Sequence, residues 1–209
     1  MGNDPDDAVR SRHLRITRPS PWVARFAALI PPGGTVLDVA AGNGRHARHL
    51  RGLGHPVVAV DRDAAALAAL TDDRGAEVIA ADLETDGPVF GAGGVLSGRA
   101  FAGIVVVNYL HRPLLAPLVQ ALEPHGVLIY ETFARGNERF TRPRNPDHLL
   151  MAGELLELAA GRLQVVAYEH GLIEAAEIPG VKQRICAVND LGRGGRDDDE
   201  PPNHPIKPS

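Results

Sequence analysis

The chain has 209 residues but a single cysteine and two lysines, and it contains no long apolar run. One cysteine, Cys186, excludes an internal disulfide, which favours a reducing compartment, so we expect a cytoplasmic protein. No run approaches the length of a transmembrane helix, and the acidic N-terminus lacks the apolar core of a signal peptide. We therefore expect no membrane contact. Because arginine supplies nearly all the other positive charges, we attribute the scarcity of lysine to genomic composition rather than to function.

Charge is concentrated at the two ends of the chain. The formal net charge is −4, and the acidic excess lies within residues 1–7 and 191–209. The body between them is formally neutral, which gives no electrostatic argument for binding nucleic acid or an anionic membrane. The length suits one domain with a sizeable core. We expect a mobile N-terminal arm over residues 1–18, a folded domain over 19–189 and a disordered tail over 190–209.

Short apolar runs alternate with segments of helical spacing along the folded part. Ser20 and Asp63 are suited to cap helices that follow them, and Leu115 to Leu122 and Leu149 to Leu158 also suggest helices. Such alternation predicts an α/β fold with a mostly parallel sheet and helices on both faces. The run 101–107 is the most apolar and is expected at the centre. Strands are expected at residues 36–39, 56–61, 76–82, 101–107, 126–131, 163–169 and 181–188, the last two as an antiparallel pair.

The stretch from Val36 to Leu50 contains a strand, a glycine turn and the start of a helix. Its Gly-x-Gly-x-x-Ala pattern, with Asp61 near the end of the next strand, fits a dinucleotide site. However, Asp38 lies within this turn, and a carboxylate there would repel the pyrophosphate of NAD. The same carboxylate suits S-adenosylmethionine, which carries a sulfonium and an ammonium and no phosphate. Both cofactor classes remain possible from this stretch alone.

The pattern Asp38-x-x-x-Gly42-x-Gly44 resembles motif I of the class I S-adenosylmethionine-dependent methyltransferases. The resemblance covers roughly residues 20–188 and implies a Rossmann-like, seven-stranded sheet with an antiparallel last strand. It implies S-adenosylmethionine as cofactor, with acids at three successive strand ends, where ligands bind in open α/β sheets. The cofactor-binding residues that it implies are Asp38 near the ammonium, Ala40 in place of a common glycine, Gly42 and Gly44 at the methionine, Asp61 at the ribose, Asp82 and Leu83 at the adenine, and Asn108 near the methyl group.

The acceptor is less well indicated. A general base is needed only if the acceptor must lose a proton, and the candidates facing the methyl group are Asn108, Tyr109, His111 and Glu131. The polar loop 132–146 combines two phenylalanines with four arginines, which could hold a planar anionic acceptor or RNA. This loop resembles a proteobacterial group of uncharacterised methyltransferases and, more distantly, the tellurite- and thiopurine-type enzymes.

We predict methyl transfer from S-adenosylmethionine, by in-line displacement, to a small-molecule acceptor. Asn108-Tyr109 lacks the prolines of the Asn-Pro-Pro-Tyr signature of amino-group nucleic-acid methyltransferases, so an RNA acceptor is an alternative that we do not favour. The sequence also leaves open an NAD-dependent oxidoreductase and a pseudoenzyme that only binds the cofactor. His46 and His49 share a helix face without a third ligand at metal spacing, so no metal is expected. The sequence does not indicate the oligomeric state.

Overall fold

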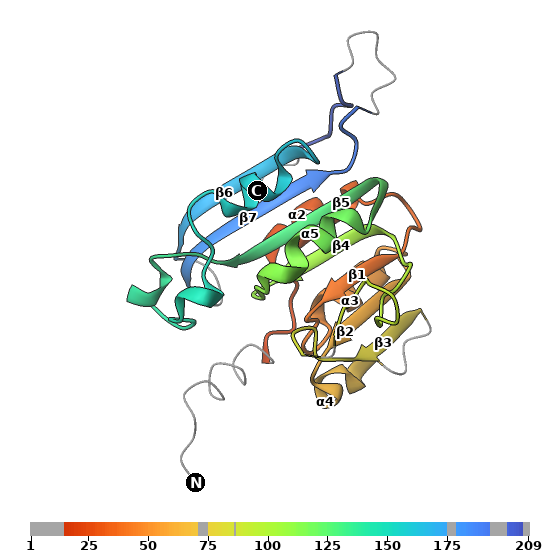
Figure 1. The fold of residues 1–209 in the computed structure, drawn as a ribbon, viewed down its shortest axis with the longest axis horizontal. Coiled ribbons are helices and arrows are strands. Elements are labelled where there is room, and N and C mark those ends of the chain that lie inside the picture. The colour runs from red at the N-terminus through yellow and green to blue at the C-terminus, as the bar shows by residue number, and fades with distance from the viewer. Residues whose placement is uncertain (1–14, 71–74, 86, 175–178, 193–199, 207–209) are drawn as a thin grey trace.

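In the computed structural model, seven strands form a single sheet (Figure 1). The structure describes residues 15–70, 75–85, 87–174, 179–192 and 200–206. The strand order is β3-β2-β1-β4-β5-β7-β6, in which β1 to β5 pair in parallel and β7 runs antiparallel to both β5 and β6. This arrangement confirms the predicted Rossmann-like fold with a reversed last strand. The strands are β1 Val36–Val39, β2 Val57–Asp61, β3 Ala76–Ala80, β4 Phe101–Val107, β5 Leu122–Phe133, β6 Gln164–Ile173 and β7 Gly180–Val188.

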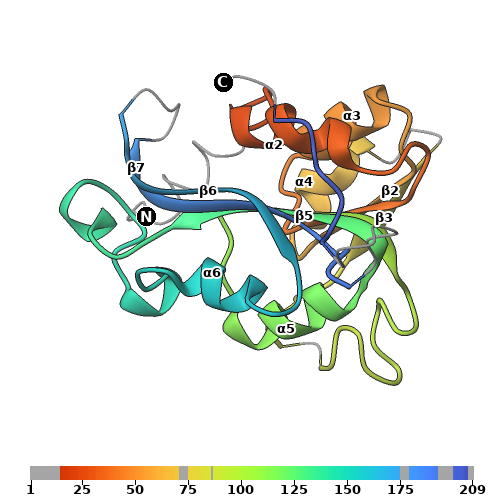
Figure 2. The same ribbon diagram turned by 90° about the horizontal axis from the view of Figure 1, so that it is seen from above.

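Helices cover both faces of this sheet, as Figure 2 shows. The helices α2, α3 and α4 lie on one face, and α5 and α6 lie on the other. The described helices are α2 Pro21–Phe26, α3 Arg45–Gly52, α4 Ala64–Leu67, α5 Arg112–Gln120 and α6 Glu154–Ala159, with 3₁₀ turns η1 Ala27–Leu29, η2 Ala68–Leu70, η3 Asn137–Arg139 and η4 Pro146–His148.

The sheet divides the apolar core into two layers, and residues of β4 contribute to both. Every residue of β4 is buried, and β4 is the middle strand of the order, so the prediction that the run 101–107 is central is confirmed. The predicted caps are also confirmed. The Ser20 hydroxyl accepts from the backbone N–H of Trp22, and Asp63 accepts from Ala65 and Ala66 at the start of α4.

Two predicted helices have different bounds in the structure. Leu122 is not helical, because it begins β5 and pairs with Phe101 of β4. Leu149 and Leu150 are also outside a helix, since Leu150 forms a parallel bridge with Ala134 and its N–H donates to the Phe133 carbonyl. Both leucines are fully buried although the chain there is not helical. Their apolar spacing therefore reflects packing of an extended segment, and α6 begins later, at Glu154.

The ends of the predicted domain lie partly outside the described residues. Residues 1–14 are not described, and neither are 193–199 and 207–209 of the predicted tail. Within the described part of the tail, residues 200–206 contain no helix or strand. His204 Nε2 lies 2.7 Å from a carboxylate oxygen of Asp190, which is fully buried. The domain boundaries stay a prediction.

A candidate active site at the carboxyl ends of the strands

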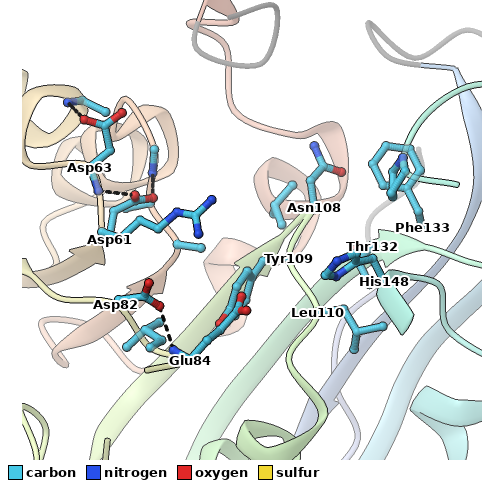
Figure 3. Close-up of a pocket in the computed structure, with 18 of the residues that line it drawn as sticks. Asp61, Asp63, Asp82, Glu84, Asn108, Tyr109, Leu110, Thr132, Phe133 and His148 are labelled. Atoms are coloured by element: carbon cyan, nitrogen blue, oxygen red, sulfur yellow. Dashed lines mark hydrogen bonds between the residues drawn. The ribbon is translucent and has the colours of Figure 1, made fainter. Parts of the chain in front are cut away.

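A cavity of about 650 Å³ opens where the parallel strands end. Its wall combines residues that follow β1, β2, β3 and β4 with the end of β5 and the loop before η4. Figure 3 shows that the labelled side chains converge on this space from separate segments of the chain. The carboxyl edge of an open α/β sheet is the usual place for a ligand. The cavity is therefore the candidate active site.

The glycine turn after β1 forms one side of the cavity. Ala40 and Gly42 both line it, and both have positive φ, 53° and 55°. The left-handed backbone costs a residue with a Cβ more than it costs glycine, which explains why a glycine is the common alternative to Ala40. The N–H of Gly42 donates to Asp61 Oδ2 at 2.8 Å. This bond fixes the turn against the end of β2.

Gly44 lies outside the wall that Ala40 and Gly42 form. It is not among the residues that line the cavity. It begins α3 with a φ of 73°, and a Cβ at this position would overlap the side chain of Leu70. The close packing of α3 against η2 therefore requires a glycine at this position. Its predicted contact with the methionine part of the cofactor stays a prediction.

Two of the three predicted strand-end acids meet at the cavity. Asp61 and Asp82 both line it, as does Leu83, with Asp63 and Glu84 beside them (Figure 3). Asp61 Oδ1 accepts from the N–H of Asp63 at 2.9 Å, and Asp82 Oδ1 accepts from the N–H of Glu84 at 2.9 Å. These backbone bonds hold each carboxylate in place. The remaining lone pairs can accept from hydroxyl or amino groups of a ligand.

The third acid, Asp38, is buried beneath the glycine turn and is not part of the cavity wall. One of its carboxylate oxygens accepts from the N–H of Ala47 in α3 at 3.0 Å, and the other lies 4.0 Å from His46 Nδ1. Burial raises the pKa of Asp38 to about 7, although the hydrogen bond from Ala47 acts in the opposite direction. Asp38 therefore anchors the start of α3. Its predicted place near the ammonium, directly or through water, stays a prediction.

His46 is likewise buried, and it is uncharged. Its Nε2 accepts from the N–H of Ser20 at 3.2 Å. Burial, together with the nearby cations Arg45 and Lys182, holds the pKa of His46 well below its usual value of 6.5. His46 also lines the cavity. A neutral imidazole in this position links the glycine turn to the start of α2.

Of the four predicted catalytic residues, the structure brings Asn108 and Tyr109 to the cavity wall, and neither His111 nor Glu131 is part of it. His111 lies further along the chain, at the start of α5. Glu131 is buried behind the wall, where its oxygens accept from Lys182 Nζ at 2.8 Å and from the Ser20 hydroxyl at 3.0 Å. These bonds join β5 to β7 and to the segment before α2, and the predicted role of Glu131 as a base stays a prediction.

The charge state of Glu131 follows from these contacts. Burial alone would raise its pKa, but Lys182, Arg184 and the Ser20 hydroxyl outweigh burial, and the pKa lies below its usual value of 4.5. The lysine is 2.8 Å from the carboxylate, and both side chains are almost completely buried. Glu131 is thus a charged partner of Lys182 at neutral pH.

Lys182, which was not predicted, does not line the cavity but contacts two residues that do. Its Nζ donates to Asn108 Oδ1 at 2.9 Å and lies 4.9 Å from the centre of the Phe133 ring. Asn108 has a φ of 58°, a conformation that a residue with a Cβ adopts only where its surroundings hold it. A weak signal existed in the sequence, because Lys182 is one of only two lysines in an arginine-rich chain.

Tyr109 completes the middle of the wall. Figure 3 shows its ring between Glu84 and Asn108. Burial raises the pKa of the Tyr109 hydroxyl, and the neighbouring carboxylates Glu84 and Asp82 raise it further. The phenol therefore keeps its proton at neutral pH and cannot serve as a base. The backbone carbonyl of Tyr109 accepts from the Tyr130 hydroxyl at 2.9 Å, which fixes this loop on β5.

The opposite wall comes from the loop that precedes η4. Thr132 and Phe133, at the end of β5, line the cavity together with Arg142, Pro143, Arg144, Asn145 and His148. His148 was not predicted, because it lies just beyond the loop 132–146 that the sequence singled out. Among the described residues, no group of three or more histidine, cysteine, aspartate or glutamate side chains could hold a metal ion. No described helix is long and apolar enough to span a membrane.

Comparison with solved structures gives the same fold. TehB from Haemophilus influenzae superposes with a TM-score of 0.63 at 18% identity, and the match covers 80% of this chain but only 61% of TehB. A TehB-like S-adenosylmethionine-dependent methyltransferase from Corynebacterium glutamicum gives 0.59 at 21% identity, covering 88% and 96%. The 1,6-didemethyltoxoflavin-N1-methyltransferase of Burkholderia thailandensis gives 0.56 at 19%, covering 90% and 91%. The comparison with curated proteins finds no match.

A family model identifies the family of the chain, whereas these distant structures show only its fold. The model described as a methyltransferase domain matches residues 11–171, which is most of the chain. The matched region includes the glycine turn, Asp61, Asp82 and Asn108. The resemblance to the class I S-adenosylmethionine-dependent enzymes is confirmed by this match and by the shared fold. The chain belongs to the methyltransferase domain family.

Proposed function

We propose that this methyltransferase binds S-adenosylmethionine in the cavity at the strand ends and transfers the methyl group to a small-molecule acceptor. One observation carries the proposal. The left-handed turn at Ala40 and Gly42 stands beside carboxylates from the ends of two neighbouring strands, Asp61 and Asp82, in one cavity. The Burkholderia methyltransferase of this fold was solved with 1,6-didemethyltoxoflavin and S-adenosylhomocysteine bound. That precedent supports a small acceptor for the present chain.

The residues present fit such a cofactor. Asp61 can accept from both ribose hydroxyls, since each of its oxygens uses one lone pair on a backbone N–H and has another to offer. Asp82 can accept from the adenine amino group, and Leu83 can cover the ring. The turn at Ala40 and Gly42 brings backbone close to the methionine part. When bound, S-adenosylmethionine supplies a carbon already activated by its sulfonium.

The protein then has to align the two reactants and exclude water. Asn108 and Tyr109 lie between the carboxylate end of the cavity and its arginine wall, as Figure 3 shows for the labelled side chains. This position is where an acceptor atom would meet the methyl group. If the acceptor must lose a proton, His148 can take it, since the other imidazole in the wall, His46, already accepts from Ser20.

NAD fits the same cavity less well. Its pyrophosphate would lie at the glycine turn, yet the cavity wall carries the carboxylates of Asp61, Asp63, Asp82 and Glu84. Arg45 and Arg62 also line this side, but the four carboxylates outnumber them, so two negative phosphates there are repelled. A cofactor with a sulfonium and an ammonium is favoured by the same charges.

For the compartment of the protein we propose the cytoplasm, since Cys186 is buried and unpaired.

Calorimetry tests the cofactor assignment. We expect the protein to bind S-adenosylhomocysteine and to show no binding of NAD under the same conditions. Asp61→Ala should weaken S-adenosylhomocysteine binding by roughly 1–3 kcal/mol, because the ribose hydroxyls lose their acceptor. Asp61→Asn, which keeps one acceptor oxygen, should lose less.

Two results would contradict the assignment. Binding of NAD without S-adenosylhomocysteine would remove S-adenosylmethionine as cofactor. Equal affinity of wild type and Asp61→Ala would show that the ribose lies elsewhere. Because Asp61 also accepts from Gly42 and Asp63, thermal unfolding of each variant must confirm that the turn remains folded.

A further inference from the structure

The cavity has one end rich in carboxylates and another end rich in arginines. Asp61, Asp82 and Glu84 lie together on one side in Figure 3, whereas Thr132, Phe133 and His148 lie on the other. The arginines that line the cavity on this second side are Arg142 and Arg144. No carboxylate of the described residues that line the cavity belongs to the second side. The two ends are therefore suited to ligands of opposite charge.

Arginines also line the carboxylate side, but there they are outnumbered. Arg45 and Arg62 come from the segments that follow the glycine turn and β2, and four carboxylates line the cavity with them: Asp61, Asp63, Asp82 and Glu84. On the opposite wall, Arg142 and Arg144 are accompanied by uncharged polar side chains and a histidine. The electrostatic difference thus lies between the two walls and not in the net charge of the cavity.

Asn108, between the two walls, presents a hydrogen-bond donor. A lysine ammonium can only donate, so the Asn108 atom that faces Lys182 Nζ at 2.9 Å must be the carbonyl oxygen Oδ1. The amide nitrogen Nδ2 is then the polar atom left to face the cavity, and Figure 3 shows the two atoms pointing apart. Glu131 balances the charge of Lys182. Lys182 therefore acts on the site by orienting the amide of Asn108.

The arginine-bearing loop is held in place from two directions. Asn137, fully buried, donates through Nδ2 to the carbonyls of Thr141 and Pro143 at 3.2 Å and 3.0 Å. On the other side of the loop, Arg112 donates to the carbonyls of Asp147 and Leu149 at 2.7 Å and 2.9 Å. Because the backbone of this loop is held at both ends, it needs little further ordering when a ligand binds, and less conformational entropy is lost.

From this wall we infer that the methyl acceptor is a small anion, whose carboxylate or phosphate group is bound by Arg142, Arg144 and the amide nitrogen of Asn108. The guanidinium fork matches the paired oxygens of either group. The inference rests on the proposed function, which places the cofactor at the carboxylate side and leaves the arginine side for the acceptor. RNA is disfavoured because its phosphates usually require several cations spread over a surface, whereas these arginines line one cavity.

Binding of matched probes to the protein saturated with S-adenosylhomocysteine tests this inference. Benzoate and phenyl phosphate are the anionic probes, and benzamide is the neutral probe of similar size. We expect at least one of the two anions to bind about tenfold tighter than benzamide in low salt, because charge-assisted hydrogen bonds are stronger. Comparison of benzoate with phenyl phosphate decides between a carboxylate and a phosphate.

Arg144→Gln should reduce this preference by about tenfold without changing the affinity for benzamide or for S-adenosylhomocysteine. Arg139→Gln is the matched control, since Arg139 lies in the same loop region but is not part of the cavity wall. It should behave as wild type. Asn108→Asp, which replaces the donor with a carboxylate, should weaken anion binding as well.

Three outcomes overturn the inference. The first is equal affinity for anions and benzamide, and the second is an anion preference that survives Arg144→Gln. The third is tight, strongly salt-dependent binding of bulk tRNA that Arg144→Gln abolishes while the small anions do not bind, which would assign the arginines to RNA. If S-adenosylhomocysteine itself does not bind, the proposed function fails, and this failure is distinct from loss of the anion preference.

Discussion

At the scale of single residues, two of the buried carboxylates, Asp38 and Glu131, differ in how their charge is compensated. Glu131 accepts from Lys182 and Ser20, and its pKa lies below the usual value. Asp38 has no cation within hydrogen-bond distance among the described residues, and burial raises its pKa to about 7. A buried carboxylate without such a partner destabilises the folded state whenever it is ionised.

Substitution of Asp38 by asparagine should therefore have an effect that depends on pH. The folded protein holds the Asp38 proton up to about pH 7, whereas the unfolded chain releases it near 3.8. The stability that the protonated group contributes is thus lost as pH rises from about 4 to 7. The asparagine amide would stay uncharged, and its oxygen would still accept from Ala47. We expect the advantage of Asp38→Asn in free energy of unfolding to grow by roughly 1–3 kcal/mol between pH 5 and pH 8.

Urea denaturation of both proteins at the two pH values measures this difference. A stability difference that does not change with pH would show that Asp38 is already ionised at pH 5. Calorimetry of the same variant separates a structural role from a binding role. Because Asp38 is not part of the cavity wall, affinity for S-adenosylhomocysteine should be nearly unchanged. A large loss of affinity would support the predicted place of Asp38 near the ammonium of the cofactor.

From the sequence, the positions of the predicted cofactor-binding residues were easier to predict than those of the buried residues that support them. Asp61, Asp82, Leu83 and Asn108 lie at strand ends or within three residues after them, so their positions at this edge could be predicted from local sequence. Lys182 lies 74 positions from its partner Asn108 and 51 from Glu131, and only strand pairing brings them together. No local pattern carries that information. The pairing of Glu131 with Lys182 could not be predicted for the same reason.

At the scale of secondary-structure elements, the start of α3 shows why one glycine is required. Gly44 and Gly33 share the same φ of 73°, but their surroundings differ. A Cβ on Gly33 meets nothing within 4 Å, whereas a Cβ on Gly44 would overlap the Leu70 side chain. Comparison of the two positions separates backbone strain from overpacking.

Alanine at these two positions should destabilise the protein to different extents. Gly33→Ala should cost about 1 kcal/mol, the typical penalty for a left-handed residue with a Cβ. Gly44→Ala should cost roughly 1–3 kcal/mol more, because α3 must move away from η2. Chemical denaturation of both variants measures the difference. Equal losses would show that Leu70 yields without cost, and that strain alone explains the glycine.

The bounds of the elements were predictable wherever a local signal ended them. Ser20 and Asp63 cap helices as expected, because a cap is a bond between near neighbours in the chain. Leu122 and Leu150 were assigned to helices since their apolar spacing is helical, yet both pair with other segments. Apolar spacing indicates which residues are buried, and residues of an extended segment can be buried at the same spacing. Tertiary pairing therefore overrides periodicity at these two positions.

At the scale of the whole molecule, the sheet has a protected centre and an exposed edge. β4 is buried along its full length between β1 and β5. β6 lies at one edge of the sheet, opposite to β3. It pairs only with β7 among the described strands, and Val165 and Leu172 are exposed on it. Figure 1 shows β6 and β7 extending beyond the rest of the sheet. Alternation of apolar and helical segments was enough to predict this sheet and its central strand.

Hydrogen exchange should follow this gradient from centre to edge. We expect the amides of β4 to exchange only on global unfolding, because opening them requires separation of both apolar layers. The amides of β6 that point away from β7 have no partner among the described strands and should exchange much faster than those of β4. Those that pair with β7 should show opening free energies at least about 2 kcal/mol below those of β4. Protection of β6 equal to that of β4, measured by mass spectrometry at several protein concentrations, would contradict a free edge. If that protection rose with concentration, a second copy of the chain would be covering β6, as exposed strand edges allow.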